Sequence, residues 1–132
     1  MNSLHYRRHR LWLIIGWGLV AAVIVLSLIP VPFELGEGDD KIGHFTAYAS
    51  LAFWFGMLNA GLPRQLGIAA AFALMGVGIE FLQGMTDYRS FEVADMVANA
   101  LGATLGFALL QTRLGNALTW AERFLESPAR KG

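Results

Sequence analysis

The chain has 132 residues, of which 55% are hydrophobic and 15% are charged, and its formal net charge is zero. This composition is typical of a membrane protein rather than a soluble domain, and the zero net charge argues against a basic nucleic-acid-binding protein. The sequence contains no cysteine, which excludes thiol catalysis, disulfides and thiolate metal sites.

The first apolar segment follows a basic N-terminus, residues 1–10. Leu11 to Ile29 carries no charge, and at 1.5 Å per residue such a run spans a hydrocarbon core of roughly 30 Å. A cleaved signal peptide is the alternative, but the run is long and Ser27-Leu28-Ile29-Pro30 offers no small-x-small cleavage site. We therefore expect an uncleaved transmembrane helix over residues 11–29.

Three more apolar runs predict helices over residues 42–60, 66–83 and 93–110. Pro30 and Pro32 end the first helix, and an acidic loop leads to the second, where we expect Asp39 or Asp40 to cap the helix. The predicted fold class is an all-α membrane protein: a four-transmembrane-helix bundle with short loops, over residues 11–110.

Residues 111–132 are predicted to form an amphipathic helix at the cytoplasmic interface and a frayed tail after residue 126. Apolar residues recur there at helical spacing, and Glu122 belongs to the predicted polar side. The apolar residues are Leu114, Ala117, Leu118, Ala121, Phe124 and Leu125.

The positive charges predict the orientation. Arginines lie at both ends of the chain and at Arg64, whereas the loops after the first and third helices hold only Lys41 and Arg89. Because cytoplasmic flanks are enriched in Lys and Arg, we expect both termini in the cytoplasm.

Polar residues gather at the opposite, extracytoplasmic end of the predicted bundle. Small residues at Gly76, Gly102 and Gly106 would let the helices approach closely enough for these side chains to meet. Ionisable groups are costly near hydrocarbon, so several in one place need partners. We expect a shared ligand-binding site made of Asp40, Lys41, His44, Tyr48, Glu80, Gln83, Arg89, Asp95 and Asn99.

These residues resemble the VanZ-like family of small bacterial membrane proteins. The pattern is Asp40-Lys41-x-x-His44-Phe45-x-x-Tyr48, then Glu80-x-x-Gln83, then Arg89-x5-Asp95-x3-Asn99-x2-Gly102. The family is named for an accessory protein of teicoplanin resistance. The resemblance implies a multi-pass protein of the bacterial inner membrane with a role in the cell envelope or in glycopeptide susceptibility, and it supplies no activity.

Three functions are open. We favour binding of an anionic envelope lipid or headgroup, such as a polyprenyl-phosphate-linked one, because Arg89 offers a fork for phosphate. A lipid hydrolase or transferase is the alternative, with His44, Glu80 and Asp95 as catalytic candidates and Thr86 or Ser90 as nucleophile. The third is a purely structural role, in which polar contacts join the helices and Arg89 and Lys41 pair with Glu80 and Asp95.

A metal site made of His44, Glu80 and Asp95 is conceivable. The sequence has no H-x-x-x-H pair, and a lone histidine near carboxylates is usually hydrogen-bonded, so we expect neither a metal nor another cofactor. An ion path is disfavoured because the cytoplasmic half of the bundle carries no charge. The expected partners are membrane lipids, and nucleic acid is not expected.

Overall fold

The computed structural model describes residues 6–30 and 36–126, which form helices and turns without a strand. The predicted tail after residue 126 and part of the predicted acidic loop lie outside the described residues. The all-α class is confirmed. The elements are α1 (His9–Leu28), α2 (Glu37–Met57), α3 (Leu62–Gly84), α4 (Val93–Leu110), the 3₁₀ helix η1 (Arg113–Asn116) and α5 (Ala117–Glu126).

Helix α2 begins five residues before the predicted start at residue 42. Its N-cap is Gly36, and no side chain caps the helix. The prediction that Asp39 or Asp40 caps α2 is therefore wrong. Both aspartates lie inside the first turn, where a negative charge interacts favourably with the helix dipole. As a result Asp40 lies one helical turn from His44.

The loop between α2 and α3 lies three to four residues earlier in the chain than predicted, at residues 58–61 rather than 61–65. Helix α2 ends at Met57 rather than at residue 60, and α3 begins at Leu62 rather than at residue 66. Pro63 lies in the first turn of α3. A backbone N–H at this position has no hydrogen-bond partner within the helix, so proline is tolerated there. Gly61 makes the reversal with a φ of 98°, a conformation that favours glycine.

Three described helices, α1, α3 and α4, are long and apolar enough to cross a membrane. Helix α2 has the necessary length, but its first turn is acidic, and it is not among them. Many apolar side chains point outwards, including Ile14 at 69% and Leu74 at 71% exposure. A surface this apolar fits contact with lipid, and the chain is accordingly a membrane protein.

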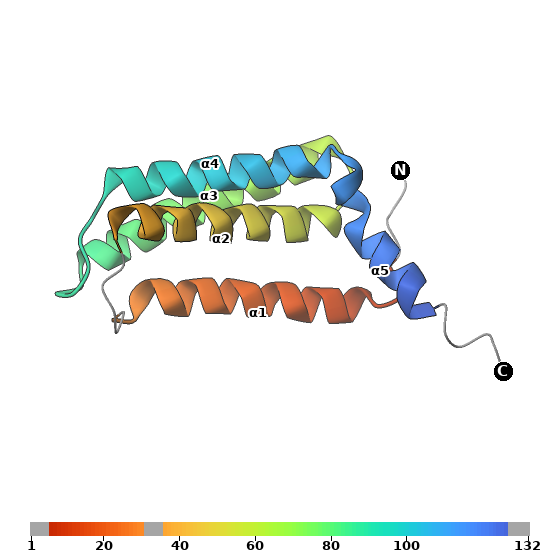
Figure 1. Cartoon of the computed structure of the whole chain (residues 1–132), viewed down its shortest axis with the longest axis horizontal. Coiled ribbons are helices and arrows are strands. Elements are labelled where there is room, and N and C mark those ends of the chain that lie inside the picture. The colour runs from red at the N-terminus through yellow and green to blue at the C-terminus, as the bar shows by residue number, and fades with distance from the viewer. Residues whose placement is uncertain (1–5, 31–35, 127–132) are drawn as a thin grey trace.

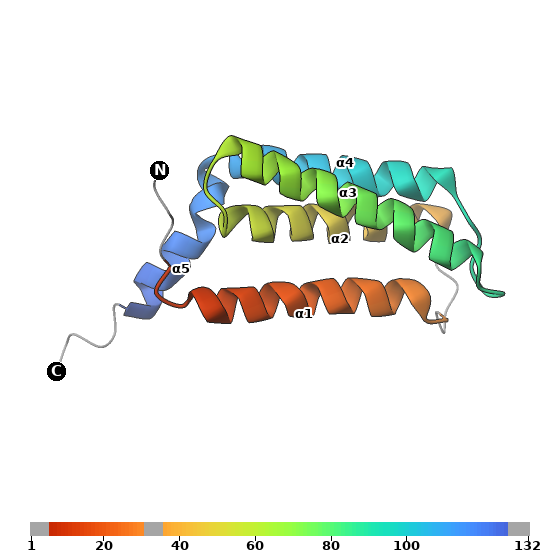
Figure 2. The same cartoon turned by 180° about the vertical axis from the view of Figure 1, so that it is seen from behind.

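The helices run up and down along one long axis (Figure 1). Helices α2, α3 and α4 pack together and α1 lies alongside them, while α5 crosses one end of the bundle near the start of α1 (Figures 1 and 2). The end of α1, the start of α2, the end of α3 and the start of α4 meet at the opposite end. This opposite end is called the distal end below.

The closest helix pair is α2 with α4. A Cβ at Gly102 would collide with the carbonyl oxygen of Phe45, and one at Gly106 would collide with that of Ala49. A Cβ at Gly76 of α3 would lie 2.8 Å from Asn99 Nδ2. The expected role of these three glycines in close helix packing is therefore confirmed.

Helix α5 is fixed to the start of α1 through Glu122. This residue is only 8% exposed, so its assignment to a solvent-facing polar side is wrong. Its Oε1 accepts hydrogen bonds from the backbone N–H of Arg8 and from Trp12 Nε1, both at 2.8 Å, and its Oε2 accepts one from the N–H of Arg7 at 3.0 Å. The side chain turns inward because it satisfies the free amides at the start of α1.

Candidate functional site

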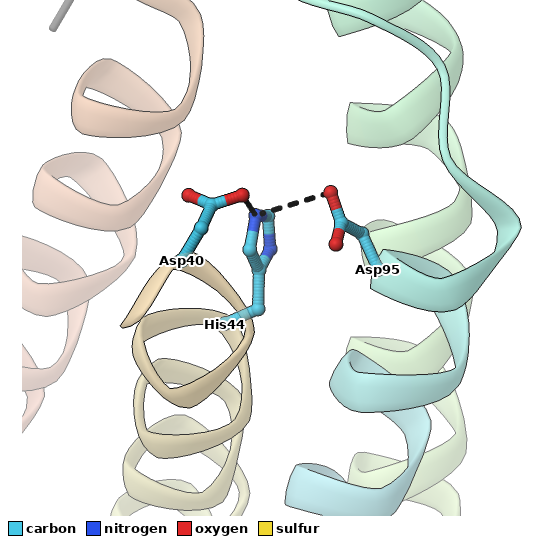
Figure 3. Close-up of side chains that lie close together, drawn as sticks. All are labelled: Asp40, His44 and Asp95. Carbon is cyan, nitrogen blue, oxygen red and sulfur yellow. Dashed lines mark ion pairs between the residues drawn. The ribbon is translucent and has the colours of Figure 1, made fainter. Parts of the chain in front are cut away.

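The centre of the site is His44 on α2, which faces Asn99 and Asp95 on α4. His44 is 8% exposed, and its Nδ1 lies 3.0 Å from Asn99 Oδ1. Its Nε2 lies 3.6 Å from Asp40 Oδ2 and 3.7 Å from Asp95 Oδ2. Figure 3 shows the imidazole standing between the two carboxylates, one from its own helix and one from α4.

Each of these carboxylates has a cation on its other oxygen. Asp40 Oδ1 lies 3.8 Å from Arg89 Nη1, and Asp95 Oδ1 lies 3.7 Å from Lys41 Nζ. The Oδ2 atoms of both aspartates therefore converge on His44. The expected pairing of Lys41 with Asp95 is present, whereas Arg89 pairs with Asp40 rather than with Glu80 or Asp95.

Glu80 of α3 is fully buried and holds the start of α4. Its Oε1 accepts the backbone N–H of Glu92, the N-cap of α4, at 2.6 Å. The side chain of Glu92 in turn accepts a hydrogen bond from Lys41 at 3.1 Å, and this bond lowers the pKa of Glu92. Glu92 was not among the predicted site residues, although it lies one helical turn before Asp95.

Gln83 and Arg89 connect the distal end to α1 instead of facing His44. Gln83 Nε2 donates to the carbonyl oxygen of Ser27 at 2.8 Å, and Arg89 Nη2 donates to that of Leu26 at 3.3 Å. Arg89 still reaches Asp40 with its other nitrogen, whereas Gln83 contributes through the position of α1.

A cavity of about 320 Å³ opens between α1 and α2 at this end. Its walls combine apolar residues with the polar residues of the distal end. They are Val23, Leu26, Ser27, Asp39, Asp40, Gly43, His44, Ala47, Tyr48 and Arg89. The predicted site contains no residue of α1, because the residues that α1 supplies to the cavity are mostly apolar.

Several polar atoms of the site are buried without a hydrogen-bond partner. Among the described residues of the site these atoms are Tyr48 OH, Glu80 Oε2, Asp95 Oδ1 and Asn99 Nδ2. A buried polar atom without a partner costs about 1–3 kcal/mol. A bound molecule that reaches these atoms, water included, would remove this penalty.

The two candidate nucleophiles lie in the loop between α3 and α4, and each forms a hydrogen bond with a residue close to it in sequence. Thr86 Oγ1 donates to the carbonyl oxygen of Gln83 at 2.7 Å, and Ser90 Oγ lies 3.4 Å from Glu92 Oε1. Neither residue lines the cavity. The structure therefore gives no support to an arrangement in which His44 activates Thr86 or Ser90.

Comparison with known proteins adds the family. The family model described as VanZ/LLP1 matches residues 18–114. The chain is 34% identical over 84 residues to an uncharacterized fission-yeast protein, C11E3.10, and the matched region covers 61% of this chain. The match spans about half of that relative, 49% of its length. No solved structure matches. The family model covers most of the chain, including every residue of the predicted site, and the chain belongs to the VanZ/LLP1 family.

Proposed function

We propose that this protein binds a phosphate-bearing lipid in the cavity between α1 and α2. The observation that carries the proposal is the composition of the cavity wall, in which apolar residues of α1 adjoin Arg89 and His44. An acyl or prenyl chain would lie against Val23 and Leu26, and the phosphate would lie near Arg89. A guanidinium presents paired donors that match phosphate oxygens.

The geometry of Arg89 supports this role. Its Nη1 is 3.8 Å from Asp40 Oδ1, which is beyond hydrogen-bond distance, and its side chain is only 16% exposed. Holding a cation in that position near the membrane is costly unless it serves a ligand or a strong pair.

The site is proposed to lie on the extracytoplasmic side of a four-span bundle. Helix α2 would be the fourth span, and the arginine-rich end with α5 would face the cytoplasm with both termini, as the distribution of positive charge favours. Helix α5 would lie in the interface, with its exposed Trp120 and Phe124 towards the lipid. In a bacterium this would be the inner membrane, with consequences for the envelope and for glycopeptide susceptibility.

The fission-yeast relative supports a ligand class that is common to bacterial and eukaryotic membranes. Glycerophospholipids and polyprenyl phosphates both meet this condition, and both present a phosphate on a long apolar chain.

Mass spectrometry of lipids that copurify with the protein tests the proposal and separates these two sources. Wild-type protein is expected to retain a phosphate lipid, and Arg89→Gln is expected to lose most of it. Arg64→Gln is the matched control, because it removes the same charge from an exposed residue at the other end of the bundle. Equal retention by wild type and Arg89→Gln, with both folded, would refute phosphate binding at Arg89.

A lipid phosphate hydrolase or transferase is the second candidate. It is supported by His44, which lies in the cavity wall with two carboxylates beside its Nε2. This candidate predicts that purified protein turns over a labelled lipid phosphate and that His44→Ala abolishes the turnover. Binding without turnover would reject it.

A further inference from the structure

Asp40, His44 and Asp95 form a group with the composition and spacing of a metal site. One ligand atom from each residue lies within 4.8 Å of the other two. His44 Nε2 is 3.6 and 3.7 Å from the facing carboxylate oxygens, too far for a hydrogen bond. In a tetrahedral site with bonds of about 2.1 Å, ligand atoms lie about 3.4 Å apart. The three atoms therefore surround a space of the right size for an ion.

The hydrogen bond from His44 to Asn99 prepares Nε2 for this role. Asn99 Oδ1 lies 3.0 Å from Nδ1, and a carbonyl oxygen can only accept, so the proton belongs on Nδ1. When Nε2 carries no proton, its lone pair points between the two carboxylates (Figure 3). Metal-binding histidines are commonly oriented in this way by a hydrogen bond from their other nitrogen.

The two carboxylates are also positioned by cations near their other oxygen atoms. Arg89 and Lys41 lie near the Oδ1 atoms of Asp40 and Asp95, which leaves the Oδ2 atoms directed at His44. Asp95 is only 4% exposed, and its Oδ1 has no hydrogen-bond partner. The two carboxylates repel each other, and a cation bound between them would attract both.

We infer that Asp40, His44 and Asp95 bind a divalent transition-metal cation. One imidazole nitrogen with two carboxylate oxygens suits Zn²⁺ or Mn²⁺, whereas Mg²⁺ and Ca²⁺ prefer oxygen ligands alone. Glu80, the third ligand of the metal site considered from the sequence, is engaged elsewhere. Its Oε1 is bonded to the N–H of Glu92, and Asp40 takes its place through the early start of α2.

The cation site does not depend on the proposed lipid. Asp40 and His44 line the cavity, so a cation bound to them would add positive charge to a wall that also holds Asp39. That charge would strengthen phosphate binding at the same place, because a divalent ion bridges phosphate oxygens well. Metal binding and lipid binding can nevertheless be measured separately.

The test uses the full chain in maltoside micelles, which contain no phosphate, after treatment with a chelator. Mn²⁺ is titrated and followed by electron paramagnetic resonance, and Zn²⁺ is then added as a competitor. We expect one Mn²⁺ per chain, displaced by Zn²⁺. Asp40→Asn, His44→Gln and Asp95→Asn should each weaken binding by at least about 100-fold, and Asn99→Leu by about 10- to 100-fold.

Asp39→Asn is the matched control. It removes the same charge from the neighbouring residue, which lies outside the trio, and should change the affinity less than about threefold. Asp40→Asn is the decisive ligand variant. The side chain of Asp40 is 30% exposed, so among the three ligand substitutions this one should disturb folding least. Circular dichroism confirms that each variant is folded.

Two results would overturn the inference. One is the absence of Mn²⁺ and Zn²⁺ binding by folded wild-type protein. The other is an equal loss of affinity in Asp39→Asn and Asp40→Asn, which would indicate diffuse attraction to an acidic surface. Metal binding without any copurifying phosphate lipid would refute the proposed function and leave the cation site intact.

Discussion

Glu122 shows how one side chain can hold two distant parts of the chain together. Its carboxylate caps the start of α1 from α5, more than one hundred residues away in sequence. Burial alone would raise the pKa of Glu122, but the backbone N–H of Arg8, the indole of Trp12 and the N–H of Arg7 together lower it. The charged form is therefore the one that stabilises the fold.

We expect Glu122→Gln to destabilise the protein by about 1–3 kcal/mol at neutral pH, because it weakens hydrogen bonds to a charged acceptor. A lowered folded pKa stabilises the protein above the unfolded pKa, about 4.3, and this contribution is lost as the pH falls through the folded pKa. Unfolding in detergent as a function of pH measures the effect. A difference between wild type and Glu122→Gln that stays constant down to acidic pH would contradict it.

The site residues that the sequence could predict are those that share a helix face and a depth. His44 with Lys41, and Asp95 with Asn99, follow from helical spacing and the up-and-down order of the helices. Arg89 belongs to the predicted site, but its pairing with Asp40 could not be predicted, because helical spacing does not extend into the loop between α3 and α4. Glu92 was missed because it lies just before the apolar run that begins at Val93. The burial of Glu122 was not predicted either, because a helical wheel sorts residues by polarity and takes no account of the hydrogen-bond partners available to them.

Among the elements, the packing of α2 against α4 sets the geometry of the site. The backbones approach so closely at Gly102 that a side chain there would meet the carbonyl oxygen of Phe45. Backbone cannot move aside as a flexible side chain can. His44 and Asn99 lie on this interface, so their hydrogen bond depends on the approach.

Gly102→Ala is therefore expected to cost at least about 1–3 kcal/mol through overpacking, and to separate His44 from Asn99. The matched control is Gly78→Ala on α3, where a Cβ meets nothing within 4 Å. That change should be neutral or stabilising by up to about 1 kcal/mol, because alanine is the better helix former. Thermal unfolding of both variants in detergent measures the contrast, and similar midpoints would show that α2 and α4 do not need the glycine.

The helix boundaries were predictable where apolar runs define them and less so where polar residues join the helix. Helix α4 has the predicted bounds, residues 93–110. Helix α2 extends backwards through Asp39 and Asp40, since acidic residues are favourable in a first turn. Hydropathy alone placed its start at the first apolar residue, and this error concealed the proximity of Asp40 to His44.

At the scale of the whole molecule, the proposed orientation can be tested because the chain has no cysteine of its own. Single cysteines at Asp87 and Arg64 would lie at opposite ends of the bundle, and both residues are exposed. In intact cells a membrane-impermeant thiol reagent should label Asp87→Cys and spare Arg64→Cys until the membrane is opened. Labelling of Arg64→Cys alone would reverse the orientation, and labelling of both in sealed cells would exclude it.

The cavity between α1 and α2 is proposed to hold a ligand beside Arg89 and His44. Ala47 lines this cavity, so Ala47→Trp should fill it. The matched control is Ala73→Trp, in a separate groove of about 190 Å³ between α3 and α4. Native mass spectrometry counts the phosphate lipids bound to each folded protein. We predict that wild type and Ala73→Trp retain a bound lipid and that Ala47→Trp loses it; retention by Ala47→Trp would contradict the claim.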